Sequence, residues 1–172
     1  MPKIIAGLRE RLLYEAERQL MENGYSAMTI RGVAKACKVA VGTVYNYFPA
    51  KEAFVASVLL QRWEQAVAVI EETARGGREP EELVRCIYSQ LCAFMDQYRV
   101  LFQDEGAVAV FTASFARYHD LLRSQLAGPL QRFCQSEFEA EFIAEALLTW
   151  TVAGEGFDEI YRVIQKIFIK EK

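Results

Sequence analysis

The sequence has few of the residues on which enzymes and metal sites depend. It contains one histidine, His119, and four cysteines (Cys37, Cys86, Cys92 and Cys134) that lie far apart and form no C-x-x-C pair. This spacing excludes a Cys/His zinc site of the usual kind. A glycine-rich phosphate loop and a nucleophile elbow are missing too, so we expect no enzyme, metal or cofactor. The thiols are expected to be reduced and mostly buried, with a redox-sensing or ligand-lining thiol as the alternative.

Long hydrophobic runs and β-alternating runs are also missing. No stretch approaches the ~20 apolar residues that cross a bilayer, and no signal-peptide run follows the Met1-Pro2-Lys3 start. We therefore expect a cytoplasmic chain with no membrane partner. Hydrophobic residues make up 52% and charged residues 25% of the 172 residues, which is typical of a globular protein with a sizeable core.

Charge is divided unevenly along the chain. Residues 1–60 hold eight basic and five acidic residues, a charge of +3, which leaves −6 for residues 61–172 because the total is −3. A basic first third indicates contact with a polyanion. The difference is modest, so motifs have to identify that polyanion.

Apolar residues recur at helical spacing throughout, which predicts an all-α fold of about nine helices. Asn23-Gly24 marks the end of the first helix, because a left-handed residue ends a helix at little cost when it is glycine or asparagine. Thr29 is the expected N-cap of the second helix. The predicted helices span residues 4–22, 30–37, 41–47, 51–75, 80–103, 107–118, 118–136, 138–153 and 156–170.

The second and third predicted helices are short, lie close together and follow a longer helix, which predicts a helix-turn-helix unit. The second short helix of such a unit lies in the DNA major groove. In the stretch VGTVYNYFPAKEAF we expect Phe48 and Phe54 to face a small core. The hydroxyl groups of Thr43, Tyr45 and Tyr47 would then face phosphate oxygens.

These residues resemble a known family. The stretch TIRGVAKACKVAVGTVYNYFPAKEAF is similar to the DNA-binding region of the tetracycline-repressor (TetR) family of bacterial transcription regulators. The likeness runs from about Ile5 to Leu60 and includes GYSAMTIRGVA and V-x-x-G-T-V-Y-x-Y-F. It implies a helix-turn-helix domain at residues 1–50 and a helical ligand-binding and dimerisation domain at residues 51–172.

The resemblance also implies which residues contact double-stranded DNA. By position, threonine, tyrosine and lysine side chains would bind phosphates, Arg31 would approach a base, and the face of residues 40–43 would read the groove. The predicted DNA-binding residues are Thr29, Arg31, Lys38, Val41, Gly42, Thr43, Tyr45, Asn46, Tyr47 and Lys51.

Three positions depart from the family pattern. Lys38 stands where the family has a turn glycine, so a positive φ there would cost roughly 1 kcal/mol. Ala40 replaces a serine or threonine cap, a loss of about 1 kcal/mol. Val41 replaces a polar base reader, and it can touch a thymine methyl group but cannot donate a hydrogen bond.

In this family the C-terminal helices form a small-molecule pocket, which implies an effector for this chain. Aromatic residues around the predicted break at residues 105–106 would line a site for a small apolar or aromatic molecule, although most aromatic residues must fill the core. The predicted ligand-binding residues are Tyr98, Phe102, Phe111, Thr112, Phe115 and Trp150.

A helix-turn-helix reader usually acts as a symmetric dimer, because operator half-sites lie about one helical turn or more apart. The last two predicted helices carry an apolar stripe that a monomer would not easily hide, and two such pairs would form a four-helix bundle. The alternative is a stripe that packs within one chain. The predicted homodimer contacts are Leu147, Leu148, Val152, Phe157, Ile160, Tyr161, Ile164 and Phe168.

Together these features predict a ligand-responsive transcriptional regulator, most often a repressor, that binds a palindromic operator as a dimer. Its effector would release the DNA by favouring a state that no longer matches the operator. The alternative is a DNA-binding regulator without a small-molecule effector, controlled by a protein partner or by cysteine oxidation.

Overall fold

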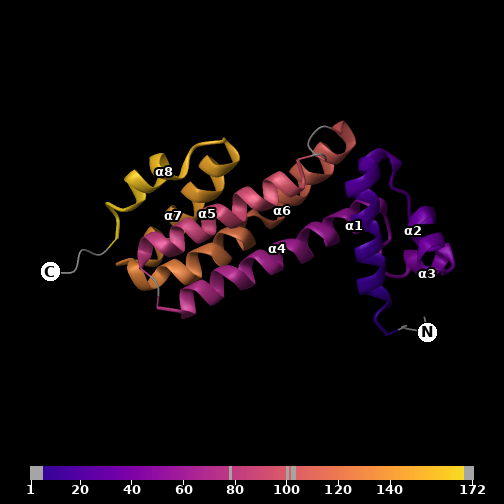
Figure 1. Ribbon diagram of the computed structural model, residues 1–172, viewed down its shortest axis with the longest axis horizontal. Helices are drawn as coiled ribbons and strands as arrows, with labels where there is room; N and C mark the ends of the chain where they lie inside the picture. The colour runs from indigo at the N-terminus through magenta and orange to yellow at the C-terminus, as the bar shows by residue number, and fades with distance from the viewer. Residues whose placement is uncertain (1–5, 78, 100, 102–103, 169–172) are drawn as a thin grey trace. The chain divides into compact units, whose positions relative to one another are not determined.

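The chain forms helices and no strand over the residues that the structure describes, which confirms the predicted all-α fold (Figure 1). The computed structural model describes residues 6–77, 79–99, 101 and 104–168, without the side chains of Phe111, Ser114 and Phe115. The helices are α1 (Leu8–Ala27), α2 (Ile30–Ala36), α3 (Val41–Tyr45), α4 (Lys51–Arg75), α5 (Pro80–Gln97), α6 (Glu105–Leu130), the 3-10 helix η2 (Gln131–Phe133), α7 (Glu137–Val152) and α8 (Phe157–Ile164).

The helices are divided between two compact units. Unit 1 comprises Met1–Arg62 and Tyr98–Ala116, and unit 2 comprises Trp63–Gln97 and Arg117–Lys172. This division differs from the two consecutive domains expected from the sequence. The reason is that α4 and α6 are long helices, and each contributes residues to both units.

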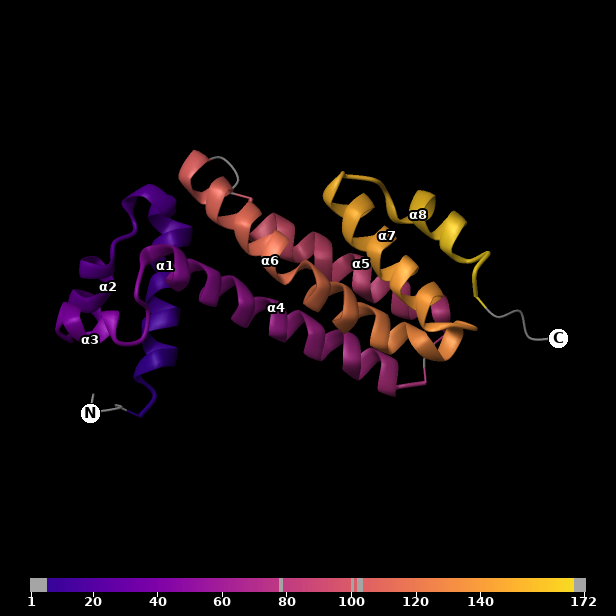
Figure 2. The same cartoon turned by 180° about the vertical axis from the view of Figure 1, so that it is seen from behind.

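Unit 1 contains α1, α2 and α3, and α2 packs on both of its neighbours (Figures 1 and 2). Gly24 interrupts α1 with a φ of 80°, at the place where the sequence predicts a helix end. The chain turns there, and helical hydrogen bonding continues to Ala27. The unit then buries apolar residues from every helix, including Leu12, Val33 and Phe54.

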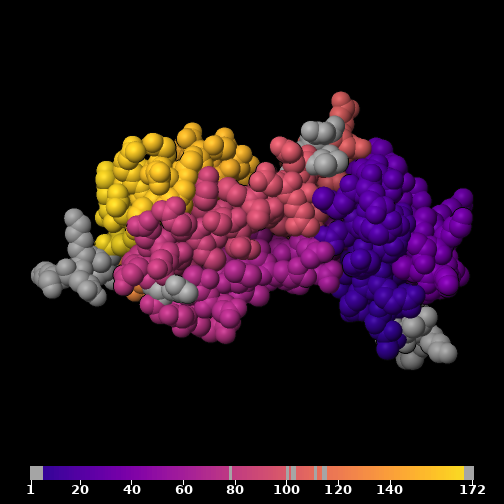
Figure 3. Space-filling model, viewed as in Figure 1, coloured from indigo at the N-terminus to yellow at the C-terminus, as the bar shows by residue number. Residues whose placement is uncertain are grey.

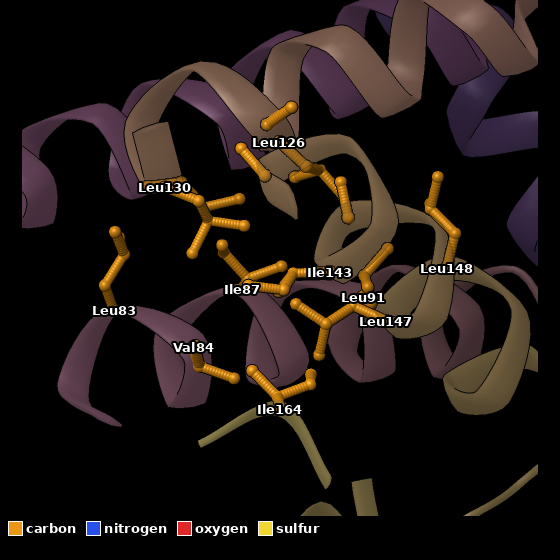
Figure 4. Packing of buried hydrophobic residues seen from close by; sticks show 14 of the residues in the cluster. Leu83, Val84, Ile87, Leu91, Leu126, Leu130, Ile143, Leu147, Leu148 and Ile164 are labelled. Atoms are coloured by element: carbon orange, nitrogen blue, oxygen red, sulfur yellow. The ribbon is translucent and has the colours of Figure 1, made fainter. Parts of the chain in front are cut away.

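Unit 2 is organised around one hydrophobic cluster. Side chains from α5, α6, α7 and α8 converge on it, among them Ile87, Leu126, Leu147 and Ile164 (Figure 4). All four are at most 1% exposed. Burial of this kind contributes about 1.5–3 kcal/mol per large aliphatic side chain, so the cluster contributes strongly to the stability of unit 2.

α6 corrects one prediction. The sequence indicated two helices, at residues 107–118 and 118–136, whereas the structure has the single helix Glu105–Leu130. No glycine or proline lies between Gly106 and Gly128, so nothing in the local sequence interrupts the helix. Pro129 lies in the last turn, and the helix ends one residue later.

α4 is the one described helix that is long and apolar enough to cross a membrane by length and composition alone. In this structure 44% of that apolar stretch is buried inside the protein. Its apolar residues supply the cores of both units, including Phe54 in unit 1 and Ile70 in unit 2. Core packing therefore accounts for its composition.

Candidate nucleic-acid interface

α2 and α3 are joined by a short turn whose two ends the structure defines. Thr29 caps α2, because its Oγ1 accepts a hydrogen bond from Gly32 N at 3.0 Å. Lys38 adopts a φ of 56°, in the left-handed region, as its position in place of a turn glycine predicts. Ala40 precedes α3 without a side-chain capping bond, which confirms the loss expected at that position.

The turn is fastened to α1 through Arg11 and Cys37. Arg11 Nη2 donates to the carbonyl oxygen of Cys37 at 3.1 Å, and Cys37 Sγ donates to the carbonyl oxygen of Arg11 at 3.7 Å. Burial is the main cause that raises the pKa of the Cys37 thiol. This cysteine is therefore a structural contact between the supporting helix and the turn.

The aromatic residues after α3 divide by face. The rings of Phe48 and Phe54 stack with centroids 4.1 Å apart, and both side chains are buried, as predicted. Tyr45 is 50% exposed, and Tyr47 is half-buried. The stacked pair belongs to the small core of the head, which is the unit formed by α1, α2, α3 and the start of α4, while the exposed Tyr45 side chain can reach outward.

None of the ten predicted DNA-binding residues is buried, and all of them lie in unit 1. Val41, Thr43, Tyr47 and Lys51 are half-buried. Their DNA contacts stay predictions. Figure 3 shows one face of the segment that contains α1 to α3, in indigo and purple. The exposed ones are Thr29, Arg31, Lys38, Gly42, Tyr45 and Asn46.

The charged side chains of the helix-turn-helix segment are all positive. Residues 23–51 contain Arg31, Lys35, Lys38 and Lys51 and no acidic residue. The first three of these side chains are exposed. A surface with cations and no competing carboxylate in its own sequence is suited to the phosphates of a nucleic acid.

Lys51 is held in a defined place at the start of α4. Its Nζ lies 4.0 Å from the centre of the Tyr25 ring, and Tyr25 Oη donates to Glu52 Oε1 at 3.3 Å. Burial lowers the pKa of Lys51, and the nearby carboxylates of Asp104 and Glu52 oppose that shift. The tyrosine ring thus orients one of the predicted phosphate-binding cations.

Asp104, which was not among the predicted site residues, connects α1 to the first turn of α6. Asp104 Oδ2 accepts hydrogen bonds from Ser26 N at 3.1 Å and from Ser26 Oγ at 2.5 Å. Asp104 Oδ1 accepts from Gly106 N at 2.9 Å and Ala107 N at 3.1 Å. An aspartate just before a helix is a capping signal, and the sequence alone could have identified it. The bond to Ser26, 78 residues away, has no such signal.

The predicted ligand-binding residues do not form one described site. Tyr98 is fully buried in unit 1, where its Oη donates to Glu17 Oε1 at 2.8 Å. Thr112 is exposed in unit 1, and Trp150 is 52% exposed in unit 2. Phe102 and the side chains of Phe111 and Phe115 lie outside the described residues.

A shallow groove of about 320 Å³ lies in unit 2, and none of the six predicted ligand-binding residues lines it. Its lining mixes an arginine and a glutamate with a thiol and two hydroxyl groups. The lining residues are Thr73, Glu82, Arg85, Cys86 and Ser89.

The predicted dimer stripe is largely buried within one chain, which corrects the premise that a monomer could not hide it. Val152 is 49% exposed and Tyr161 is half-buried. The other side chains pack in the core cluster of unit 2, where each is at most 9% exposed. These core residues are Leu147, Leu148, Phe157, Ile160, Ile164 and Phe168.

Comparisons with known proteins agree with the helix-turn-helix geometry. Residues 12–58 match the family model described as bacterial regulatory proteins, tetR family. The regulator UidR of Escherichia coli K12 is 32% identical over 81 residues, which cover 47% of this chain and 41% of UidR. The repressor KstR of Rhodococcus jostii RHA1 is 34% identical over 91 residues, covering 52% of this chain and 41% of KstR.

The fold is shared over nearly the whole chain. The crystal structure of FadR from Thermus thermophilus, a repressor in complex with lauroyl-CoA, superposes with a TM-score of 0.62 at 21% identity. That superposition covers 95% of this chain and 96% of FadR, whereas the sequence matches to UidR and KstR span less than half of those proteins. Residues 12–58, which contain the helix-turn-helix at α2 and α3, are thus similar to the tetR family of bacterial regulatory proteins, and the all-helical fold of the chain is shared with FadR.

Proposed function

We propose that this chain is a cytoplasmic transcriptional regulator, a repressor, that binds a palindromic DNA operator through α2 and α3. One observation carries the proposal: the head has a stacked aromatic core and an accessible face with cations and tyrosine hydroxyl groups. Tyr45 and Arg31 lie on that face, while Phe48 and Phe54 hold it together. The relatives that match this segment are regulators, which favours regulation over catalysis.

Substitutions in the head test DNA binding. Tyr45→Ala and Lys51→Ala should each weaken binding to every duplex, and loss of the Lys51 cation should lower the salt slope by about 1. The matched control is Tyr14→Ala, because Tyr14 is 69% exposed on α1 and no role in DNA binding is assigned to it. Fluorescence anisotropy with a labelled duplex over a salt series measures both quantities. Equal affinity of Tyr45→Ala and the control would refute the assignment.

The exposed part of α7 supports a homodimer. Phe138 is 73% exposed and Phe142 49%, and Trp150 and Val152 are 52% and 49% exposed. At 100° per residue these four lie within an arc of about 160° on one side of α7. Monomeric soluble proteins rarely leave so many large apolar side chains together in solvent, so a second copy of the chain would cover this face.

Charges placed on that face test the dimer. Phe142→Glu or Trp150→Glu should produce monomers in sedimentation, because a carboxylate would lose its hydration in the interface. A charge at Leu148 or Ile164 would unfold the core instead, since both side chains are 1% exposed. The control is Val69→Glu on α4, where an apolar side chain is 44% exposed and no interface is proposed. Dimers that persist in both α7 variants would place the interface elsewhere.

The proposal includes a small apolar or aromatic effector that releases the protein from its DNA operator. Its support is the aromatic content of the C-terminal helices and the shared fold with FadR, whose structure contains lauroyl-CoA. A thermal-shift screen that includes fatty acyl-CoA and planar aromatic compounds should yield a stabilising ligand that also lowers DNA affinity. A screen without any stabilising compound would favour control by a protein partner or by oxidation.

If cysteine oxidation controls the protein, two of the four cysteines are the candidates. Burial raises the pKa of Cys37, and it raises the pKa of Cys134 to about 11. Both thiols are therefore poor nucleophiles. Cys86 and Cys92 are half-buried and are the candidates for this alternative. Peroxide treatment that abolishes DNA binding in the wild type but not in Cys86→Ser or Cys92→Ser would establish it.

A further inference from the structure

The ring of Tyr25, a residue of α1, lies against groups from two other helices of unit 1. Lys51 Nζ, at the start of α4, lies 4.0 Å from the ring centre, and the ring hydroxyl group donates to Glu52. On the α6 side, a Cβ atom placed on Gly106 would lie 3.1 Å from Tyr25 Cε1. That contact would be tight, so glycine at position 106 lets the α6 backbone approach the ring closely.

Asp104 fixes that approach. One carboxylate oxygen caps the first turn of α6 through Gly106 N and Ala107 N. The other accepts two hydrogen bonds from Ser26, the residue next to Tyr25 in the chain. A single carboxylate thus joins the end of α1, which carries Tyr25, to the start of α6.

We propose that Asp104 is a positioning residue for DNA binding, which acts through Tyr25 on the phosphate-binding cation of Lys51. Asp104 holds the start of α6 against Tyr25, and Tyr25 then holds Lys51 at the edge of the helix-turn-helix. The inference rests on the proposed DNA-binding function, and it adds a residue that lies outside the matched segment 12–58.

The charge of Asp104 has the opposite effect to its positioning role. A carboxylate near Lys51 disfavours an approaching phosphate, so removal of the charge alone should strengthen DNA binding. Loss of the positioning bonds should weaken it. The two effects can be separated because Glu105 is the next residue and is exposed, and its side chain forms no hydrogen bond or ion pair with another described residue.

Asp104→Asn and Glu105→Gln form the matched pair for the test. Each removes one negative charge from the same turn. Asparagine at position 104 can still cap α6 through its carbonyl oxygen, but its amide group faces the Ser26 N–H group and cannot accept from it. Ser26→Ala is a second, uncharged variant that removes the 2.5 Å bond to Asp104.

The probe is a labelled 40-base-pair duplex of mixed sequence at low salt, because phosphate binding does not require the operator. We expect Asp104→Asn to bind about threefold or more weakly than Glu105→Gln, with Ser26→Ala weakened in the same direction. The salt slope of Asp104→Asn should fall towards that of Lys51→Ala, by up to about 1. In a Lys51→Ala background, the difference between the matched pair should disappear.

Several results would overturn this role. Equal affinity of Asp104→Asn and Glu105→Gln, or tighter binding by Asp104→Asn, would show that its charge alone matters. A difference that persists without Lys51 would exclude the path through Tyr25. If Asp104→Asn does not fold, unchanged affinity in Ser26→Ala refutes the proposal. Failure of the wild-type chain to bind any duplex would refute the proposed function itself, and the inference with it.

Discussion

Tyr98 offers a sharp test of how unit 1 is stabilised. Its side chain is fully buried just after α5, and its hydroxyl group donates to Glu17 Oε1 at 2.8 Å. Glu17, on α1, also accepts from Arg62 Nε at 2.5 Å and pairs with the second guanidinium nitrogen through its other oxygen. The network therefore connects α1, α4 and the segment after α5 through one buried carboxylate. Tyr98→Phe removes one hydroxyl group from it and leaves the packing of the ring in place.

The expected loss in the free energy of unfolding depends on the partner that Glu17 keeps. A hydrogen bond to a charged group contributes about 1.5–3 kcal/mol. Because Glu17 keeps Arg62, its charge is not left unpaired, and the loss should fall in the lower half of that range. We therefore expect Tyr98→Phe to reduce the free energy of unfolding by about 1.5–2 kcal/mol. A chain of this size should then lose roughly 3–8 °C in Tm.

Urea unfolding followed by circular dichroism measures this change, with Tyr14→Phe as the control. Tyr14 is 69% exposed and its hydroxyl group forms no hydrogen bond with another described residue, so its variant should stay within about 0.5 kcal/mol of the wild type. Equal stabilities of Tyr98→Phe and Tyr14→Phe would refute the reasoning. A stabilising effector that binds equally well to Tyr98→Phe would agree with a structural role for this hydroxyl group.

Three further changes should have defined effects on stability. Lys38→Gly should stabilise the chain by about 0.5–1 kcal/mol in urea unfolding, because relief of the left-handed strain exceeds the added unfolded-state entropy; a loss would contradict this. Thr29→Ala should cost about 1 kcal/mol through the lost cap of α2, and no change would show that the Gly32 bond contributes nothing. Hydrogen bonds from Ser26, followed by those from α6, lower the pKa of Asp104. Its stabilisation is therefore present above the unfolded pKa of about 3.9 and is lost as pH falls through the lower folded pKa. The stability gap between wild type and Asp104→Asn should shrink between pH 7 and pH 2, and a constant gap would contradict this sign.

The sequence alone predicted those features that depend on neighbours in the chain. The cap at Thr29, the positive φ at Lys38 and the start of α4 at Lys51 follow from local backbone preferences. The division of the aromatic residues into buried Phe48 and exposed Tyr45 follows from helical periodicity. The resemblance to the TetR family rests on the same local pattern.

Helical periodicity did not predict which surface covers an apolar helix face. The stripe on α7 and α8 was correctly recognised as apolar, but Leu147 and Ile164 pack against α5 in the same chain. A helical pattern shows that a face is covered and does not show which surface covers it. The exposed Phe138 and Trp150 lie on another side of α7, which periodicity alone did not separate from the core.

The sequence by itself determined the all-α class, the helix-turn-helix and the chemistry of its outer face, because these depend on contacts within a few turns of helix. The tertiary structure alone decided that Asp104 meets Ser26 and that Tyr98 meets Glu17, 78 and 81 residues apart. Such pairs carry no local signal, since their hydrogen bonds form only after packing has brought distant helices together. The helix-turn-helix motif can therefore be identified from the sequence, whereas the contacts that orient its side chains form only in the fold.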